Sequence, residues 1–261
     1  MEPHLLVIDG LNIIRRCYEA NLAPDSVEKA QGALRSSAAS IRRALQEHKP
    51  THVVLAMDPV GQKWRHALYP AYQAKRKPMP QPLSDALRKT PGWRSWAQAL
   101  GIAGWEVPGF EADDLMSSLV AIWEEYFGDA LVTLLSTDKD LCSLVRPNVR
   151  VRDHFNQILR DEAWVEAKFG VRPDQLLDYL ALTGDAVDGI PGVDRIGAKS
   201  AAQLLQAHGT LEHVLAAAAD MPGARGEALR NGVEAARLSR QLTQLRSDLR
   251  YEGLSQAKAP A

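Results

Sequence analysis

Acidic side chains follow three apolar, strand-like segments of this sequence. Asp9 and Asp58 each come directly after an apolar run, and Asp138 and Asp140 lie just beyond a third run. A single aspartate after a strand is most often a turn or capping residue. In a parallel sheet, however, the carboxyl ends of the strands meet at one edge, where ligands bind. The repetition therefore predicts a group of carboxylates gathered at that edge.

A second group of acids lies in the segment PGFEADD. Glu111, Asp113 and Asp114 fall at the start of a helical pattern, where acids also favour the helix dipole and act as caps. Three carboxylates so close together exceed what capping needs, and unpaired they would repel and raise one another's pKa. A divalent cation removes this repulsion, and oxygen ligands suit Mg²⁺ or Mn²⁺. The pattern therefore predicts a divalent-metal site.

The stretch GDAVDGIPGVDRIGAKSAAQLL, residues 184–205, combines acids with a glycine-rich turn. Asp185 and Asp188 come first, and Lys199 and Ser200 open an apolar helix pattern at its end. Free backbone amides at a helix N-terminus beside a lysine form a phosphate-binding site. Acids at one end and a phosphate site at the other predict metal-assisted chemistry on a phosphodiester strand.

A basic, aromatic and proline-rich segment at about 61–105 lies between the second and third apolar runs. Proline keeps residues 77–82 from forming a regular helix. Two interpretations stay open at this point: a solvated surface loop, or an arm that contacts the nucleic-acid backbone. In the second interpretation cations meet phosphates and an aromatic ring stacks on a base, and the candidates are Trp64, Tyr72, Lys75, Arg76 and Lys77.

These side chains need elements that bring them together. Apolar runs near 5–8, 52–57 and 130–135 predict buried strands, and helical spacing fills residues 26–48 between the first two. Strands separated by helices predict an α/β fold with a parallel sheet and crossover helices.

The pattern changes at about residue 165, where it becomes wholly helical. We therefore expect an α/β domain over residues 1–164, a helical module over 165–250 and a flexible tail over 251–261. Within the helical module, residues 225–247 are predicted to form one charged amphipathic helix.

The composition is that of an ordinary globular protein, with 46% hydrophobic and 24% charged residues and a formal net charge of −1. A nucleic-acid binder with this charge must separate a basic surface from an acidic pocket. Cys17 and Cys142 have no ligand-like spacing, so we expect free thiols and no zinc site. We expect a cytoplasmic protein that does not contact membranes, because the sequence starts without a basic leader and lacks the ~20 apolar residues of a membrane span.

Taken together, these segments resemble the 5′-nuclease (flap endonuclease) family. That family includes the nuclease domain of bacterial DNA polymerase I, phage 5′-exonucleases and stand-alone bacterial Xni-type enzymes, to which this chain is similar in length. The resemblance covers Leu5 to about Leu249. It rests on VIDG at 7–10, AMD at 56–58, RHALYPAYQAKR at 65–76, VPGFEADD at 107–114, STDKD at 136–140 and GDAVDGIPGVDRIGAKSA at 184–201.

The resemblance implies a PIN- or resolvase-like parallel-sheet nuclease domain followed by a helical helix–three-turn–helix DNA-binding module. It implies a bacterial, nucleoid-associated monomer that cleaves DNA at 5′ flaps, branches and 5′ ends in replication or repair, leaving a 5′-phosphate and a 3′-hydroxyl. In the family, two groups of acids hold two divalent ions. The matching carboxylates are Asp9, Asp58, Glu111, Asp113 and Asp114 in one group, and Asp138, Asp140, Asp185 and Asp188 in the other.

The resemblance also implies a potassium ion, bound by backbone carbonyls in the turn of the helical module and touching a DNA phosphate. A plain turn held by Pro191 and Gly192 is the alternative. The matching carbonyls belong to Leu182, Thr183, Pro191, Val193 and Ile196. The DNA contacts that the motifs imply are Arg65, Tyr72, Lys75, Arg76, Arg195, Ile196, Gly197, Ala198, Lys199 and Ser200.

One position departs from the family pattern. The arm of the family carries a lysine that is thought to reach the scissile phosphate, and this chain has Gln73 there. Our hypothesis is that Lys75 takes over this role, beside Arg76 as a second catalytic cation. Three rival functions stay open: a non-catalytic DNA-binding protein on the same fold, which Gln73 favours, a PIN-type ribonuclease, and a phosphate-binding metabolic enzyme. The last would need a glycine-rich loop after the first strand, which this sequence lacks.

Overall fold

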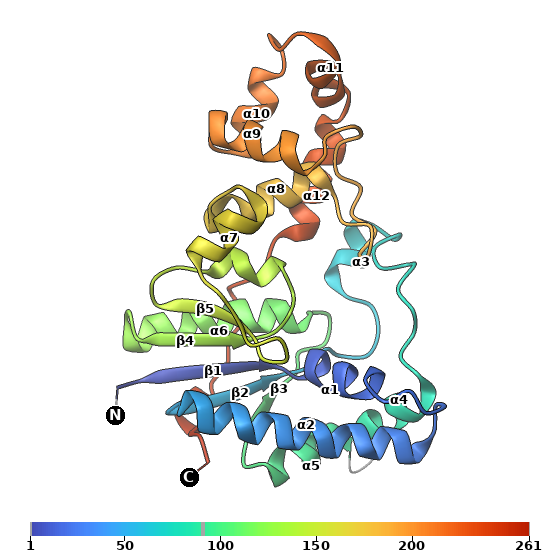
Figure 1. Cartoon of the computed structure of the whole chain (residues 1–261), viewed down its shortest axis with the longest axis vertical. Coiled ribbons are helices and arrows are strands. Elements are labelled where there is room, and N and C mark those ends of the chain that lie inside the picture. Colours follow the sequence, from blue (N-terminus) through green and yellow to red (C-terminus); the bar gives the residue numbers. More distant parts are fainter. Residues whose placement is uncertain (1, 90–91, 261) are drawn as a thin grey trace.

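Six strands form one sheet in the order β3-β2-β1-β4-β5-β6, seen in the lower half of Figure 1. The structure is a computed structural model that describes residues 2–89 and 92–260. All neighbouring strands are parallel except β6, which runs antiparallel to β5. The strands are β1 (His4–Asp9), β2 (His52–Ala56), β3 (Ala103–Trp105), β4 (Leu131–Leu135), β5 (Val149–Asp153) and β6 (Ile158–Arg160). The predicted parallel α/β sheet is confirmed, although β3 is too short to produce a recognisable sequence pattern.

Helices cover both faces of the sheet (Figure 1). Successive strand residues point to opposite faces, so Leu5 and Val7 pack with α6 while Leu6 and Ile8 pack with α1 and α2. The predicted helix at 26–48 is confirmed as α2. The helices of this part are α1 (Gly10–Glu19), α2 (Val27–His48), α3 (Trp64–Leu68), α4 (Gln81–Arg88), α5 (Gly92–Ala99) and α6 (Ala112–Phe127), and the short 3₁₀ helix η1 (Asp140–Leu144) follows β4.

Only part of the predicted arm stands away from the sheet. Leu83 and Leu87 of α4 are fully buried in the core on the α2 side, and Trp93 of α5 is buried beside them. The prolines of this segment mask the helical pattern of α4 in the sequence. Pro82 nevertheless lies in the first turn of this helix, where proline is tolerated. The arm therefore consists of α3 and the irregular residues 69–80.

The second part of the chain is helical, as predicted, and extends from α7, beside β5, to α9, α10 and α11 at the end of the molecule away from the sheet (Figure 1). Across the described ranges, no helix combines the length and the apolar character needed to cross a bilayer. The elements are α7 (Glu162–Phe169), η2 (Pro173–Gln175), α8 (Leu176–Thr183), α9 (Ala198–His208), α10 (Leu211–Ala217), α11 (Gly223–Asn231) and α12 (Val233–Thr243), with the short η3 (Leu254–Gln256) near the C-terminus.

The prediction of one continuous helix over 225–247 is wrong. The chain breaks at Gly232 between α11 and α12. Gly232 lies so close to the turn before α9 that an added Cβ would be 2.6 Å from Val193 Cγ1. This close approach depends on tertiary packing, which helical spacing does not reveal.

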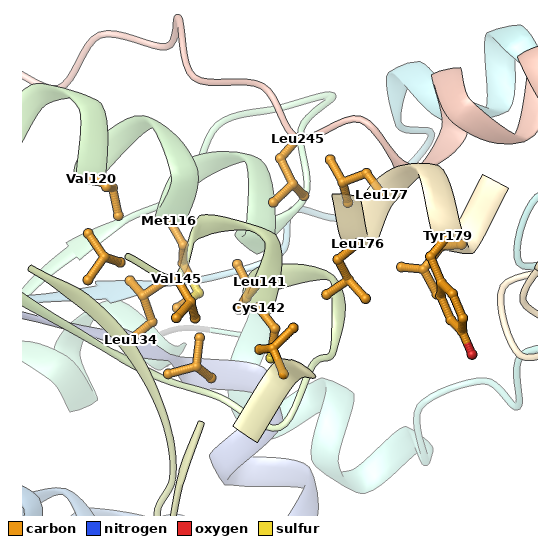
Figure 2. Packing of buried hydrophobic residues seen from close by; sticks show 14 of the residues in the cluster. Met116, Val120, Leu134, Leu141, Cys142, Val145, Leu176, Leu177, Tyr179 and Leu245 are labelled. Atoms are coloured by element: carbon orange, nitrogen blue, oxygen red, sulfur yellow. The ribbon is translucent and has the colours of Figure 1, made fainter. Parts of the chain in front are cut away.

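One hydrophobic core joins the two parts of the chain (Figure 2). Met116 and Val120 of α6 face Leu141 of η1, and Leu176 of α8 closes the cluster from the helical side. Leu245, from the segment after α12, lies between α6 and α8. Burial of this shared apolar surface fixes the helical module next to the carboxyl end of the sheet.

The C-terminal segment is docked, which contradicts the expected flexible tail over 251–261. Leu254 and Ala257 are buried, and Val53 N donates a hydrogen bond of 2.8 Å to Ala257 O. Strand β3 pairs only with the end of β2, from Val54 onward. The C-terminal segment therefore satisfies backbone groups at the start of β2 that β3 leaves open, and composition alone could not show this.

We expect Leu254→Ala to lower the free energy of unfolding by about 2–5 kcal/mol, because it leaves a cavity beneath the docked segment. Glu252→Ala is the matched control, since Glu252 is exposed two positions away. Urea denaturation of the two variants and the wild type measures the difference. Equal stability of all three proteins would show that the segment is not held against the sheet.

Candidate active site

A cavity of about 340 Å³ lies at the carboxyl end of the sheet. Seven of the nine predicted metal ligands line it: Asp9, Asp58, Glu111, Asp113, Asp138, Asp140 and Asp188. Cations of α1 and the arm line the same cavity: Arg15, Arg16, Arg65, Arg76 and Lys77. Arg65 is buried among the acids, and the other four cations are at least partly exposed.

Local hydrogen bonds fix the first carboxylates in place. Asp9 ends β1 and caps α1, because its Oδ1 accepts from Asn12 N at 3.0 Å, while its Oδ2 accepts from Ser136 Oγ at 2.8 Å. Asp58 Oδ1 accepts from Ala112 N, in the first turn of α6, at 3.2 Å. Strands β2, β1 and β4 are neighbours in the sheet, so the acids that follow them converge.

Burial and mutual repulsion raise the pKa values of these groups. Burial raises the pKa of Asp9 from 3.8 to about 7, and the charge of Asp58 contributes. Burial, followed by the charges of Asp138 and Asp9, raises the pKa of Asp113 well above its ordinary value. Asp140 has a raised pKa for the same reasons, burial and the charge of Asp138. The cavity therefore favours the uptake of positive charge.

The donor chemistry fits a hard divalent cation, because the lining offers carboxylate oxygens. Within residues 2–89 and 92–260, no three acidic, histidine or cysteine side chains are already close enough to hold one ion together. A bound cation would neutralise the repulsion among these carboxylates.

A buried arginine binds two of the predicted metal ligands. Arg65 is 3% exposed; its Nη1 donates to Glu111 Oε2 at 2.7 Å and to Asp114 Oδ2 at 2.9 Å. Its Nη2 donates to Asp114 Oδ1 at 2.9 Å. The carbonyls of Leu242 and Gln244 accept from Nε at 2.8 Å and Nη2 at 2.7 Å. These bonds use all five guanidinium N–H donors and join the arm, α6 and the end of α12.

Two of the predicted DNA contacts, Arg65 and Tyr72, are buried in the structure. Arg65 has no donor left for a phosphate. Tyr72 is 5% exposed and packs against Ile190 and Leu242, and its hydroxyl donates to Glu111 Oε2 at 3.1 Å. Both side chains belong to the cavity lining, but the end of α12 and the turn before α9 bury most of their surface.

Asp114 lies outside the cavity lining, fully buried beneath it. Besides Arg65, it accepts from Trp64 Nε1 at 2.9 Å and from the backbone N of Glu111 at 3.1 Å. These bonds make Asp114 an anchor for the start of α6 and leave it without a free oxygen directed at the cavity. Asp113, one position earlier, points into the cavity instead.

The acids of the turn before α9 are each paired with a cation. Asp185 Oδ2 accepts from Lys139 Nζ at 2.6 Å and lies outside the cavity lining. Asp188 Oδ1 pairs with Arg76 Nε at 3.1 Å at the cavity rim. Burial raises the pKa of Asp188 although Arg76 opposes the shift.

The predicted phosphate site is exposed at the start of α9. Gly197 precedes the helix, and Arg195 and Lys199 are exposed beside it, with Arg195 in the left-handed region at φ 63°. Ala198 is exposed and Ser200 is half-buried, whereas Ile196 is buried and can offer DNA its backbone alone.

The turn between α8 and α9 is held by backbone contacts. An added Cβ at Gly192 would lie 2.4 Å from Gly184 N, so the two limbs of the turn touch. Of the carbonyls predicted to bind potassium, Leu182 O accepts from Val193 N at 2.9 Å and Val193 O accepts from Ile196 N at 3.1 Å. Those of Thr183 and Pro191 lie where the limbs meet, against Gly192 and Gly184.

Sequence reasoning missed Lys63, which contacts two acids of the cavity lining. Neither Lys63 nor Lys75 is itself part of that lining, and Lys75 is exposed. Lys63 Nζ donates to Glu111 Oε1 at 3.0 Å and lies 3.6 Å from Asp58 Oδ1. A lysine within a basic segment carries no pattern that would single it out. The sequence could have indicated Ser136 as a residue of the site, because it opens the STDKD motif that contains Asp138.

Both parts of the chain match family models. Residues 4–170 match the 5′-3′ exonuclease, N-terminal resolvase-like domain, and residues 171–259 match the 5′-3′ exonuclease, C-terminal SAM fold. The chain belongs to the 5′-3′ exonuclease family. The predicted family is confirmed, and with it the predicted fold and the class of enzyme, a nuclease.

Two relatives of the family illustrate how far the likeness extends. The chain is 39% identical to flap endonuclease Xni of Pectobacterium carotovorum subsp. carotovorum (strain PC1), over all of this chain and 96% of that protein. It is 38% identical to flap endonuclease Xni of Serratia proteamaculans (strain 568), over the full length of both.

Solved structures share the fold at low identity. The T5 5′-exonuclease with bound zinc matches with a TM-score of 0.77 and 19% identity, over 92% of this chain and 89% of that one. The catalytic core of Rad2 with a DNA substrate matches with a TM-score of 0.57 and 11% identity, over 95% and 80%.

Removing one partner of the buried Arg65 network is expected to be costly. Arg65→Ala should lower the free energy of unfolding by about 3–5 kcal/mol, because Asp114 is left buried and unpaired. Arg172→Ala is the control, because both side chains of the Arg172–Asp174 pair are more than half exposed and such pairs contribute about 0–1 kcal/mol. Denaturant unfolding compares them; similar losses in the two variants would disprove the role of the network.

The crowded carboxylates should destabilise the metal-free protein. Because the folded pKa of Asp9 is about 7 and its ordinary value is 3.8, the folded protein binds more protons than the unfolded chain between these pH values. Its stability should therefore fall as the pH rises from about 4 to about 7. Asp113→Asn should raise the metal-free Tm at pH 8, where each kcal/mol is worth roughly 2–4 °C, and should reduce the further rise on adding Mg²⁺.

Calorimetry with EDTA or Mg²⁺ at several pH values tests this, with the exposed Asp220→Asn as control. If Asp113→Asn lowered the Tm of the metal-free protein, the carboxylates would not repel one another.

Proposed function

We propose that the chain is a structure-specific, divalent-metal-dependent DNA 5′-nuclease, with 5′-flap endonuclease and 5′-3′ exonuclease activity. The observation that carries the proposal is a cavity lined by seven carboxylates, joined by one core to a module with an exposed helix N-terminus. Relatives named flap endonuclease support the substrate, and the T5 enzyme with bound zinc supports the need for a divalent ion.

Two ions, Mg²⁺ or Mn²⁺, would be held by the carboxylates of the acidic cavity. When bound, they supply charge neutralisation at the phosphate and a water of lowered pKa. We assign the cavity-facing acids as ligands and Asp114 as their support, with Asp185 available once it separates from Lys139. One group is Asp9, Asp58, Glu111 and Asp113, and the other is Asp138, Asp140 and Asp188.

The residues of the chain itself bind and orient the DNA. Arg76 and Lys77 at the cavity rim can hold phosphates of the cleaved strand. The amides from Gly197 to Lys199 can bind a phosphate of the duplex at the start of α9. A potassium ion in the adjoining turn would add positive charge at that phosphate. Because these contacts address the backbone, recognition follows DNA shape and not base sequence.

The remaining expectations belong to the same proposal. Hydrolysis should leave a 5′-phosphate and a 3′-hydroxyl, and the enzyme should act as a monomer near the bacterial chromosome in the cytoplasm, in replication or repair. The bacterial relatives support the setting. The neutral Gln73 favours a second candidate, a weakly active DNA-binding protein on the same fold.

A labelled 5′-flap DNA tests the proposal. Wild type with Mg²⁺ should cut near the branch, and EDTA should stop the reaction. Asp113→Asn should lose cleavage and keep most of its affinity for the flap, measured by fluorescence anisotropy. Intact flap DNA with Mg²⁺ and with Mn²⁺ would refute the nuclease, and cleavage of an RNA flap alone would favour the ribonuclease.

A further inference from the structure

Lys63, which directly precedes α3, and Gln73 of the arm both donate to the same carboxylate oxygen of Glu111. Glu111 Oε1 accepts from Lys63 Nζ at 3.0 Å and from Gln73 Nε2, also at 3.0 Å. The amide of Gln73 is neutral, and the ammonium group of Lys63 is charged. Position 73, where this chain has glutamine in place of the lysine of the family arm, is therefore adjacent in space to Lys63.

The backbone holds Gln73 at this place. Its N–H donates to Asp188 O at 2.8 Å, and its φ of 56° places it in the left-handed region. Its Nε2 also contacts Tyr72 OH at 3.2 Å. Position 73 is therefore fixed at the cavity, while its side chain contributes no charge there.

Lys63 is held equally firmly. It caps the start of α3, where its N–H donates to His66 Nδ1 at 3.1 Å, and Arg65 two positions later anchors the same helix in the core. Its side chain is 12% exposed and lies between Glu111 and Asp58. Both of these acids line the cavity.

The charge of Lys63 already acts on the site. Its ammonium group lies 3.0 Å from Glu111 Oε1 and 3.6 Å from Asp58 Oδ1 and so offsets part of the negative charge of these acids. Bound divalent ions would take over this neutralisation. The ammonium group of Lys63 would then be free to leave the two acids and to contact a phosphate in the cavity that they line.

We propose that Lys63 contacts the scissile phosphate and supplies the positive charge that Gln73 cannot. The inference rests on the proposed nuclease function of this cavity. It replaces the hypothesis that Lys75 takes this role, because Lys63 contacts two acids of the cavity lining, Glu111 and Asp58, whereas Lys75 is exposed. The alternative is that Lys63 is only a counter-charge for Glu111 and Asp58 in the metal-free protein.

Single-turnover cleavage of a 5′-flap DNA at saturating Mg²⁺ separates these two roles. A counter-charge is no longer needed when ions are bound, so Lys63→Gln would then cleave at the wild-type rate. A phosphate contact is still needed, so Lys63→Gln should be slower by about 10²-fold, the loss typical of one charge-stabilising group. Lys63→Arg should keep most of the rate.

A double variant that moves the positive charge from position 63 to position 73 provides the decisive comparison. In the double variant Lys63→Gln with Gln73→Lys, the new ammonium group stands at the same Glu111 oxygen and should restore most of the rate. Lys89→Gln is the matched control, since Lys89 is an exposed lysine at the C-cap of α4 and is paired with Asp85. Thermal melts of each variant confirm that it is folded.

Three results would overturn the inference: Lys63→Gln as fast as wild type, a double variant as slow as Lys63→Gln, or a loss of rate in Lys75→Gln with none in Lys63→Gln. Asp113→Asn in the same assay distinguishes the failure of this inference from that of the proposed function. If Asp113→Asn cleaves normally, the acidic cavity is not the active site. If Asp113→Asn is inactive while Lys63→Gln cleaves at the wild-type rate, only the proposed role of Lys63 is refuted.

Discussion

The buried guanidinium group of Arg65 is the contact on which the site depends. Burying a charge is costly unless its partners are complete, so Arg65, Asp114 and Glu111 can be buried only together. Because the carbonyls of Leu242 and Gln244 accept from the same group, the arm, the start of α6 and the end of α12 have to be assembled jointly. One consequence concerns Glu111: Arg65 and Tyr72 hold its Oε2, so its Oε1 is presented to the cavity.

Charge balance explains the rest of the cavity. Burial raises the pKa of Asp9, Asp113 and Asp140, which is a cost to the folded state that an ordinary core would not carry. The metal-free protein limits this cost with the ion pairs Lys63–Glu111, Arg76–Asp188 and Lys139–Asp185. Arg76 and Lys139 are partly exposed on long side chains, so they separate from a carboxylate more easily than the buried Arg65 does. The same cations can therefore balance the charge of the acids and, once released from them, bind phosphate.

Sequence patterns located the acidic edge of the sheet because strand ends depend on local apolar runs, and Asp9, Asp58 and Asp138 follow such runs. They could not distinguish Asp113 from Asp114, because the two are adjacent and the choice depends on Arg65, 49 positions from Asp114. They misplaced Arg65 and Tyr72 for a similar reason, since both look like surface groups of a basic arm until α12 covers them. Long-range packing, and not local preference, decides these positions.

The turn that carries Asp188 also holds the arm, and this links DNA binding to the cavity. Gln73 N donates to Asp188 O at 2.8 Å, and an added Cβ at Gly189 would lie 3.1 Å from Ala71 O. The same turn leads into the exposed start of α9. A duplex bound there by its phosphates is therefore bound to the segment that positions both the arm and an acid of the cavity. A phosphate that takes Arg76 from Asp188 leaves that carboxylate free for a cation, so substrate and metal should each favour the binding of the other. Under the proposed function, a DNA long enough to reach both α9 and the cavity would contact this turn at both ends, which would favour duplex or branched substrates over a short single strand.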